Sequence, residues 1–258
     1  MSATGGPPRA RWFTGSESGH DAPYTVFVFP HAGGSAAQYR SWSATLPPEF
    51  EARFVQLPGR QERLREEAMD DLDSIVEVLQ DPFEGELDGR PYLLFGHSFG
   101  ALLAYRLAVA LVADGGPAPA LLGASGWAPG PGTGPPRESV ADMSDEELLD
   151  RVAELGMMPR GATLDPAVLA TVLPALRGDL LAAGGFQDDL APAPCPVAAY
   201  GGTDDPLLPA GGMDTWARRG SPFLGSTLFP GGHFYLFDHA VAVQHSLGRH
   251  LRRLVPTV

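Results

Sequence analysis

The sequence contains no lysine, a single cysteine and no long apolar run. All 18 basic residues are arginine, which excludes Schiff-base lysine chemistry and a Walker-type phosphate loop. Cys195 cannot form an internal disulfide, and a lone cysteine is typical of a protein from the reducing cytoplasm. A membrane helix needs roughly 18 consecutive apolar residues, and no stretch approaches that length. The net charge of −13 disfavours nucleic acid as a partner.

The length of 258 residues suits one α/β domain with a substantial core. We expect this domain over residues 23–258, and we expect the protein to be a monomer. The first 22 residues are rich in Gly, Ser and Pro and lack the apolar centre of a signal peptide. They indicate a flexible leader that precedes the domain.

Short apolar runs alternate with amphipathic stretches along the chain. We predict strands at 25–29, 53–57, 92–95, 121–125, 197–200 and 227–229, and helices at 69–79, 99–112, 211–218 and 240–254. Between residues 134 and 190 this alternation gives way to helical stretches alone, at 144–155, 166–173 and 176–183. The pattern implies the α/β class, with a mainly parallel sheet covered by helices on both faces and an inserted helical segment.

The pentapeptide Gly96-His97-Ser98-Phe99-Gly100 lies between an apolar strand and an apolar helix. This is the context that a G-x-S-x-G nucleophile elbow requires, because its tight turn holds the serine hydroxyl above the sheet edge. The flanking glycines lack the Cβ atoms that would clash in such a turn. Ser98 is therefore the candidate nucleophile.

A serine nucleophile needs a base and an acid that orients the base, and after this elbow they follow in the order Asp/Glu, then His. His233 is the candidate base, since it follows the last strand behind a Gly-Gly turn. Asp204 and Asp205 both follow the strand at 197–200. We favour Asp205, because Pro206 biases it towards an extended conformation at the strand end, whereas Asp204 could cap the following turn.

The backbone N–H groups of Ala32 and Phe99 are the candidate oxyanion hole. Phe99 follows the nucleophile, and Ala32 lies in the Gly-rich loop after the first of the predicted strands. His31 and His97 are near the site in sequence, and we interpret them as packing and positioning residues. No metal-ligand pattern emerges, and Cys195 is interpreted as a buried structural thiol.

Five stretches together resemble one family: Phe29 to Ser35, Gln56 to Arg63, Gly96 to Gly100, Gly201 to Pro206, and Phe229 to Tyr235. The chain resembles the type II thioesterases, the stand-alone editing hydrolases of polyketide and nonribosomal peptide assembly lines. The Leu-Pro-Gly-Arg and Pro-Gly-Gly-His-Phe-Tyr stretches are more specific than the elbow.

This resemblance implies an α/β-hydrolase fold with a helical lid over about 134–190. It implies that Ser98 attacks an acyl thioester on the phosphopantetheine arm of an acyl or peptidyl carrier protein, while His233, held by Asp205, relays the proton. No cofactor is expected, because the arm belongs to the carrier. A chain-releasing thioesterase, a small-molecule esterase and a non-catalytic binding module with a hydrolase fold remain alternatives.

Two further sets of residues follow from this resemblance. Carrier proteins are usually acidic, so docking on this acidic chain needs a local basic patch. The candidates are Arg60, Arg63 and Arg65, or Arg218 and Arg219, although an arginine run is more often a solvated face. The second set is apolar and consists of Leu155, Met157, Met158, Leu173, Leu176 and Phe186. These residues could line an acyl channel, because methionine adapts to varied apolar shapes, or they could equally be only the buried stripe of short helices.

Overall fold

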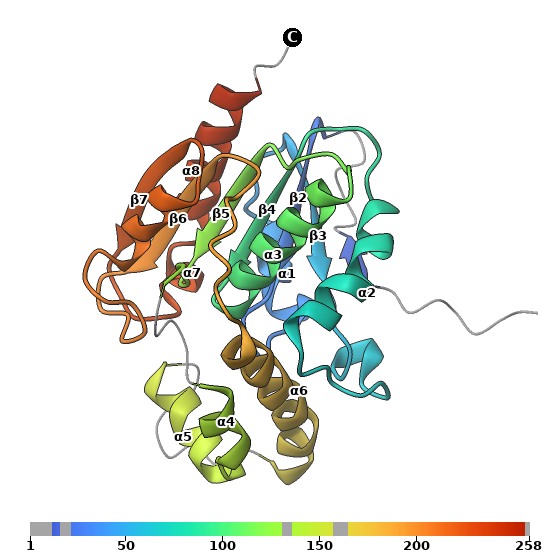
Figure 1. Cartoon of the computed structure of the whole chain (residues 1–258), viewed down its shortest axis with the longest axis vertical. Helices are drawn as coiled ribbons and strands as arrows, with labels where there is room; N and C mark the ends of the chain where they lie inside the picture. The colour runs from blue at the N-terminus through green and yellow to red at the C-terminus, as the bar shows by residue number, and fades with distance from the viewer. Residues whose placement is uncertain (1–11, 16–21, 131–135, 157–164, 256–258) are drawn as a thin grey trace, which may run out of the picture.

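A computed structural model of the chain describes residues 12–15, 22–130, 136–156 and 165–255. Within these ranges seven strands form one sheet, in the order β1-β3-β2-β4-β5-β6-β7 (Figure 1). The strands are β1 (Phe13–Gly15), β2 (Tyr24–Phe29), β3 (Phe50–Val55), β4 (Tyr92–His97), β5 (Leu121–Ser125), β6 (Val197–Gly202) and β7 (Phe223–Phe229). Only β1 is antiparallel to its neighbour, so the predicted mainly parallel sheet is confirmed.

Helices cover both faces of this sheet. In the described ranges they are α1 (Ala36–Ser43), α2 (Leu72–Glu84), α3 (Phe99–Ala113), α4 (Arg137–Asp142), α5 (Asp145–Glu154), α6 (Pro166–Gly185), α7 (Tyr235–Asp238) and α8 (Ala240–Leu254), with 3-10 helices η1 (Gln61–Arg63) and η2 (Gly212–Arg218). Figure 1 shows α2 and α3 on one face of the sheet and α1 and α8 on the other. The predicted α/β class is thus confirmed.

The side chains of β2 alternate between the two halves of the core, as the period of a strand requires. Phe27 packs on the α2 side, where its ring lies 4.5 Å from that of Phe83. Val26 and Val28 join the cluster on the α1 and α8 side, in which the Trp42 ring lies 4.6 Å from that of Phe95. A strand buried on both faces explains the unbroken apolar run in the sequence.

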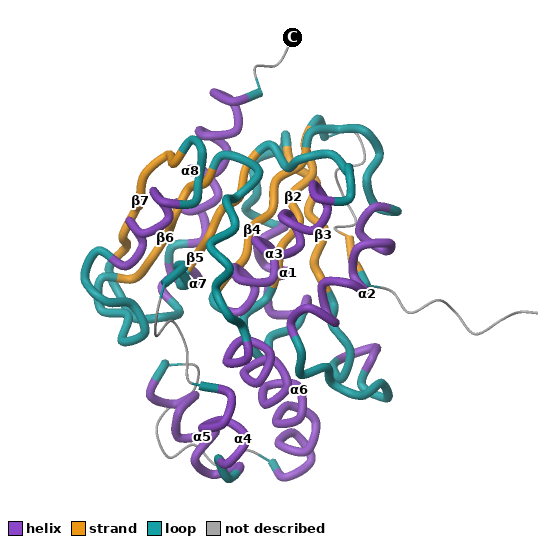
Figure 2. The backbone as a smooth tube through the Cα atoms, in the orientation of Figure 1, coloured by secondary structure: helices purple, strands orange, loops and turns teal. Residues whose placement is uncertain are grey.

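The inserted helices α4, α5 and α6 lie together beyond one end of the sheet, and Figure 2 shows them as a purple group apart from the orange strands. The sequence predicts two separate helices at 166–173 and 176–183, but the structure shows one helix that continues through Pro174. An internal proline costs about 3 kcal/mol. Burial of Leu173 and Leu176 on either side offsets this cost.

Helix α6 is also the one helix in the described ranges that is long and apolar enough to cross a membrane. Length and composition alone give a weak indication, because core helices pass the same test. In the structure α6 packs against α3 and α4.

Of the expected flexible leader, residues 1–22, positions 1–11 and 16–21 lie outside the described residues, and positions 13–15 depart from the expectation. Residues 13–15 form β1, and Phe13 pairs with Val55 at the edge of the sheet. The reason is local packing: Phe13 is buried against the rings of Phe27 and Phe83. The guanidinium of Arg63 in turn lies over the Trp12 ring, with its Cζ atom 3.8 Å from the ring centroid.

Candidate active site

Ser98 lies at the sharp turn between β4 and α3. Its backbone has φ 54° and ψ −122°, a left-handed conformation that a residue with a side chain rarely adopts. A Cβ on Gly96 would lie 2.1 Å from the Gly100 carbonyl oxygen, and a Cβ on Gly100 would lie 2.1 Å from that of Phe29. Both flanking glycines are therefore required by close backbone contacts, as the elbow motif predicts.

Asp205 and His233 come from the loops that follow β6 and β7. The Nδ1 atom of His233 lies 2.7 Å from Oδ2 of Asp205, and both side chains are buried. The other carboxylate oxygen, Oδ1, accepts a hydrogen bond of 2.9 Å from the Leu207 N–H. Asp204 is exposed, and its carboxylate accepts from the Thr203 hydroxyl. The structure therefore pairs His233 with Asp205 and leaves Asp204 on the surface.

Ser98, His233 and Ala32 line the same cavity, which has a volume of about 50 Å³. The rest of its wall is mainly apolar and consists of Met143, Val152, Leu155, Leu176, Leu180, Leu207 and Phe234, with His31 and Arg151. Ser98 itself is partly exposed and lines the cavity wall. The arrangement brings a serine, a histidine and an apolar pocket together at the carboxyl edge of the sheet, where α/β proteins place their sites.

Part of the expected acyl channel belongs to this cavity. Leu155 and Leu176 line it, whereas Leu173 lies in the core outside it. Phe186 packs on the Trp127 ring instead, at 6.2 Å between ring centroids, and Met157 and Met158 lie outside the described residues. Met143, Val152 and Leu180 also line the cavity and are not among the residues that the sequence predicts for it. Helical spacing could have found the last two, because Val152 precedes Leu155 by three positions and Leu180 follows Leu176 by four.

The loop after β2 leaves two of its amides, those of His31 and Ala32, without an internal acceptor among the described bonds. The Gly33 N–H donates to Oδ2 of Asp179 at 2.7 Å, and the Gly34 N–H donates to the His31 carbonyl at 2.8 Å. Within the described part of the chain, the Ala32 N–H has no such bond. The Phe99 N–H is the first of α3, and a helix supplies no acceptor for its first amides. Ala32 lines the same cavity as Ser98, and Phe99 directly follows Ser98 in the chain.

Two further histidines are buried beside His233. His31 Nδ1 lies 2.9 Å from the Tyr39 hydroxyl, and burial, followed by the charges of His233 and Arg60, lowers the pKa of His31 to about 3. His97 Nδ1 lies 2.8 Å from the Ser125 hydroxyl, and burial holds its pKa well below the usual value. Both imidazoles are therefore neutral near pH 7, which fits their interpretation as packing and positioning residues.

The arginines expected to form a basic docking patch are partly unavailable. Arg60 and Arg63 are buried and paired with Asp179 and Glu66, at 2.6 Å in each case. Arg219 is likewise buried and paired with Asp188 at 2.6 Å. A charged side chain enters the interior only with a partner, and the partners of these arginines lie far along the sequence or on a neighbouring turn. Arg65 and Arg218 remain exposed.

Among the residues that the structure describes, no group of three or more His, Cys, Asp or Glu side chains could hold a metal ion. Cys195 is buried and forms no disulfide, and burial raises the pKa of its thiol to about 12.

Comparison with known proteins places the chain in a family. The thioesterase domain model matches residues 24–251. The gramicidin S biosynthesis protein GrsT of Aneurinibacillus migulanus is 28% identical over 243 residues, which is 94% of each chain. Thioesterase PikA5 of Streptomyces venezuelae is 33% identical over 236 residues, 90% of this chain and 83% of that protein.

A solved structure gives the same result. The type II thioesterase BorB from the borrelidin biosynthetic cluster superposes with a TM-score of 0.79 at 31% identity, over 93% of this chain and 96% of that one. The α/β-hydrolase fold that the family resemblance implies is thereby confirmed. The chain belongs to the thioesterase domain family and is a hydrolase that acts on thioesters.

Proposed function

We propose that this thioesterase removes acyl groups from the phosphopantetheine arms of acyl or peptidyl carrier proteins, and so clears aberrant or stalled units from a polyketide or nonribosomal peptide synthase. The observation that carries the proposal is the arrangement of Ser98 and His233 on one apolar cavity, with Asp205 bonded to the far side of the imidazole. The names of relatives that act in such pathways support the substrate class.

In the acylation step, the Ser98 hydroxyl oxygen attacks the thioester carbonyl carbon, and Nε2 of His233 accepts the hydroxyl proton. The resulting tetrahedral oxyanion collapses, the C–S bond breaks, and His233 returns the proton to the departing thiol. A water molecule then attacks the acyl-enzyme by the same route. The products are the free acid and the carrier thiol, and the protein needs no cofactor of its own.

Asp205 keeps the imidazole in the tautomer that this sequence of steps requires. Its Oδ2 accepts from the Nδ1–H of His233 at 2.7 Å, which leaves Nε2 unprotonated and ready to act as a base. The buried carboxylate also stabilises the imidazolium that forms when Ser98 gives up its proton. Oδ1 is held by the Leu207 N–H, so the carboxylate is itself oriented.

The Ala32 and Phe99 N–H groups are the proposed oxyanion hole. The Ala32 N–H, like that of His31, has no internal acceptor among the described bonds, and Ala32 lines the cavity together with Ser98. The Phe99 N–H begins α3. An N–H at a helix start also carries part of the positive end of the helix dipole, which favours a developing negative charge.

The apolar cavity accepts the acyl chain in this proposal, and its small volume suits short groups such as those that misprime a synthase. We place the reaction in the cytoplasm, where a lone buried thiol such as that of Cys195 stays reduced.

The test compares hydrolysis of one acyl group from a carrier protein and from a short pantetheine mimic. We expect faster release from the carrier, lost in a Ser98→Ala variant and kept in Ser139→Ala, an exposed serine of α4. Equal rates on both substrates would contradict a carrier-directed role and favour a general thioesterase or esterase. Preferential release of a full-length product over short acyl groups would favour chain release over editing.

A further inference from the structure

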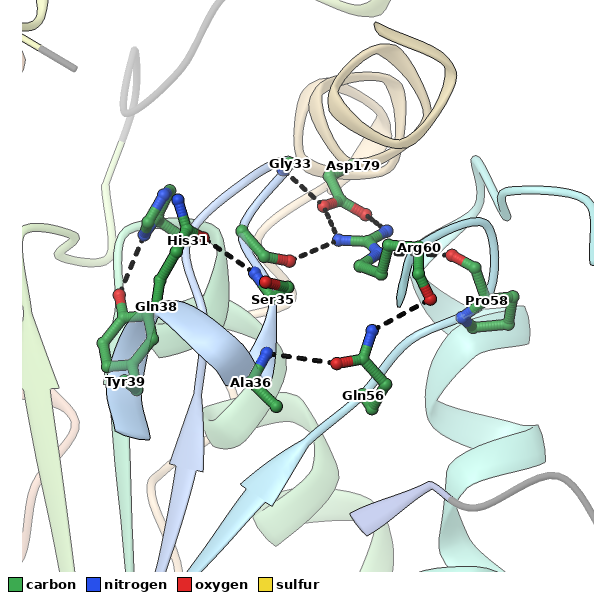
Figure 3. A network of polar contacts seen from close by, with 11 residues as sticks. His31, Gly33, Ser35, Ala36, Gln38, Tyr39, Gln56, Pro58, Arg60 and Asp179 are labelled. Carbon is green, nitrogen blue, oxygen red and sulfur yellow. Dashed lines mark hydrogen bonds and ion pairs between the residues drawn. The ribbon is translucent and has the colours of Figure 1, made fainter. Parts of the chain in front are cut away.

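Arg60, the last residue of the Leu-Pro-Gly-Arg stretch, forms a buried ion pair with Asp179 of α6. Arg60 is 6% exposed and Asp179 is 1% exposed. The contact is bidentate: Nη1 lies 2.6 Å from Oδ2, and Nη2 lies 2.9 Å from Oδ1. Figure 3 shows the guanidinium between the loop after β3 and the helix. The proposed mechanism gives this pair no role.

Both members of the pair also hold the loop that carries the proposed oxyanion donor. Oδ2 of Asp179 accepts from the Gly33 N–H at 2.7 Å, and Nη1 of Arg60 donates to the Gly34 carbonyl at 3.0 Å (Figure 3). The Gly33 N–H belongs to the peptide group whose carbonyl is that of Ala32. Two charged groups thus fix the backbone immediately after the Ala32 amide.

A third side chain extends this arrangement to the start of α1. Gln56 accepts from the Ala36 N–H at 3.1 Å and donates to the Arg60 carbonyl at 3.2 Å, and Figure 3 shows it below the ion pair. The loop at residues 31–35 is therefore held on one side by the loop after β3, and on the other side by α6.

Stability alone does not explain a buried ion pair at this place. Apolar residues of similar volume are often as stabilising as a buried Arg–carboxylate pair, because desolvation offsets the attraction. Apolar residues cannot, however, accept a hydrogen bond from the Gly33 N–H. The loop backbone also lies directly against α6: Gly33 has φ +69°, and a Cβ on it would lie 3.0 Å from that of Leu176.

We propose that Asp179 and Arg60 are positioning residues that hold the Ala32 N–H at the oxyanion site. This inference rests on the proposed function of Ala32. It also links two parts of the active site, because Leu176 and Leu180 of the same helix line the acyl cavity. A shift of α6 therefore moves the pocket wall and the oxyanion loop together.

Three variants separate positioning from stability. Arg60→Met with Asp179→Leu replaces the ion pair by apolar side chains and removes the acceptor for Gly33. Asp179→Asn keeps one oxygen for Gly33 but weakens the ion pair. Arg219→Met with Asp188→Leu removes another largely buried Arg–Asp pair, which lines no part of the cavity, and is the matched control. The substrate is S-propionyl-N-acetylcysteamine, and melting temperatures are measured by circular dichroism.

We expect the Arg60→Met, Asp179→Leu enzyme to melt near the wild-type temperature, while kcat falls about 10- to 100-fold and KM changes little. Its affinity for a trifluoromethyl ketone analogue, which forms a tetrahedral adduct with the serine, should fall by the same factor. Asp179→Asn should melt lower but keep kcat within about threefold, and the control pair should keep it within about twofold. A folded double variant with wild-type kcat overturns the proposal.

If the double variant does not fold, the comparison passes to Asp179→Asn and Asp179→Ala, at a temperature at which both are folded. A rate at least about tenfold higher for Asp179→Asn supports positioning, and equal rates overturn it. If the wild type itself shows no turnover that depends on Ser98, the proposed function fails and this inference fails with it. Wild-type turnover with an equally fast double variant overturns the positioning role alone.

Discussion

Replacing Asp205 by asparagine should remove most of the catalytic activity without unfolding the protein, because of how the two carboxylate oxygens are used. Oδ1 accepts from the Leu207 N–H at 2.9 Å, and Oδ2 faces Nδ1 of His233 at 2.7 Å. The carboxamide has one oxygen for these two donors. If its oxygen keeps the Leu207 bond, its NH₂ faces Nδ1, so the imidazole must carry its proton on Nε2 and cannot accept the Ser98 proton.

The opposite orientation would keep the useful tautomer but place the NH₂ against the Leu207 N–H. A buried donor without an acceptor costs about 1–3 kcal/mol, so the unproductive tautomer should dominate by roughly 5- to 150-fold. Loss of the negative charge beside the developing imidazolium adds to this. In a serine triad the same change lowers kcat by about 10⁴, or about 5 kcal/mol of barrier. We expect a loss of about 10³ to 10⁴ here.

The assay is kcat for hydrolysis of a short acyl thioester, with circular dichroism to verify folding. Asp204→Asn is the matched control, since that carboxylate is exposed and bonds only the Thr203 hydroxyl among the described side-chain contacts. It should change kcat less than about twofold. The reasoning would be refuted by an Asp205→Asn enzyme within tenfold of the wild type, or by a larger loss in Asp204→Asn.

Three further predictions concern stability and reactivity. Gly100→Ala would place a Cβ 2.1 Å from the Phe29 carbonyl oxygen, so its melting temperature should fall by several degrees, and an unchanged value would contradict the close packing at the elbow. Between pH 6.5 and 3 the unfolded chain protonates His31 while the folded chain, in which its pKa is about 3, does not. The free energy of unfolding should therefore fall with decreasing pH by up to about 1.4 kcal/mol per pH unit from this residue. Urea unfolding of His31→Gln at several pH values should show a free energy of unfolding that depends less steeply on pH than that of the wild type. Cys195, with a thiol pKa of about 12, should resist iodoacetamide at pH 8 until urea unfolds the protein, and rapid labelling of the folded protein would show that the thiol is accessible.

The strand and elbow pattern could be predicted because it depends on near neighbours in the chain. The apolar run before Ser98 forms β4 up to His97, and the two glycines around the serine are required by contacts within that same turn and with β2. The sequence at α1 also contains a helix signal, although the predicted elements do not include this helix. Ser35 and Gln38 form a capping box, and Tyr39 and Trp42 lie three positions apart on its buried face.

The parts that could not be predicted depend on contacts between distant segments. Arg60 and Asp179 are 119 positions apart, and the local sequence around either residue does not indicate that the other is its partner. An arginine run also reads as a surface feature, although Arg60 and Arg63 are buried. For the acid, Pro206 already favours Asp205 over Asp204 in the sequence, but the contact of Asp205 with His233 joins two loops that are 28 positions apart.

The three residues of β1 lie along the outer edge of the sheet beside β3. Without them, the six residues of β3 would offer a row of unpaired amide and carbonyl groups on which another molecule could assemble. Very short edge strands are one way in which proteins limit such edge-to-edge pairing. Resistance to aggregation in concentrated solution therefore depends in part on a segment that contacts neither the cavity nor the catalytic loops, and trimming the N-terminus through Gly15 to obtain a smaller enzyme would weaken it.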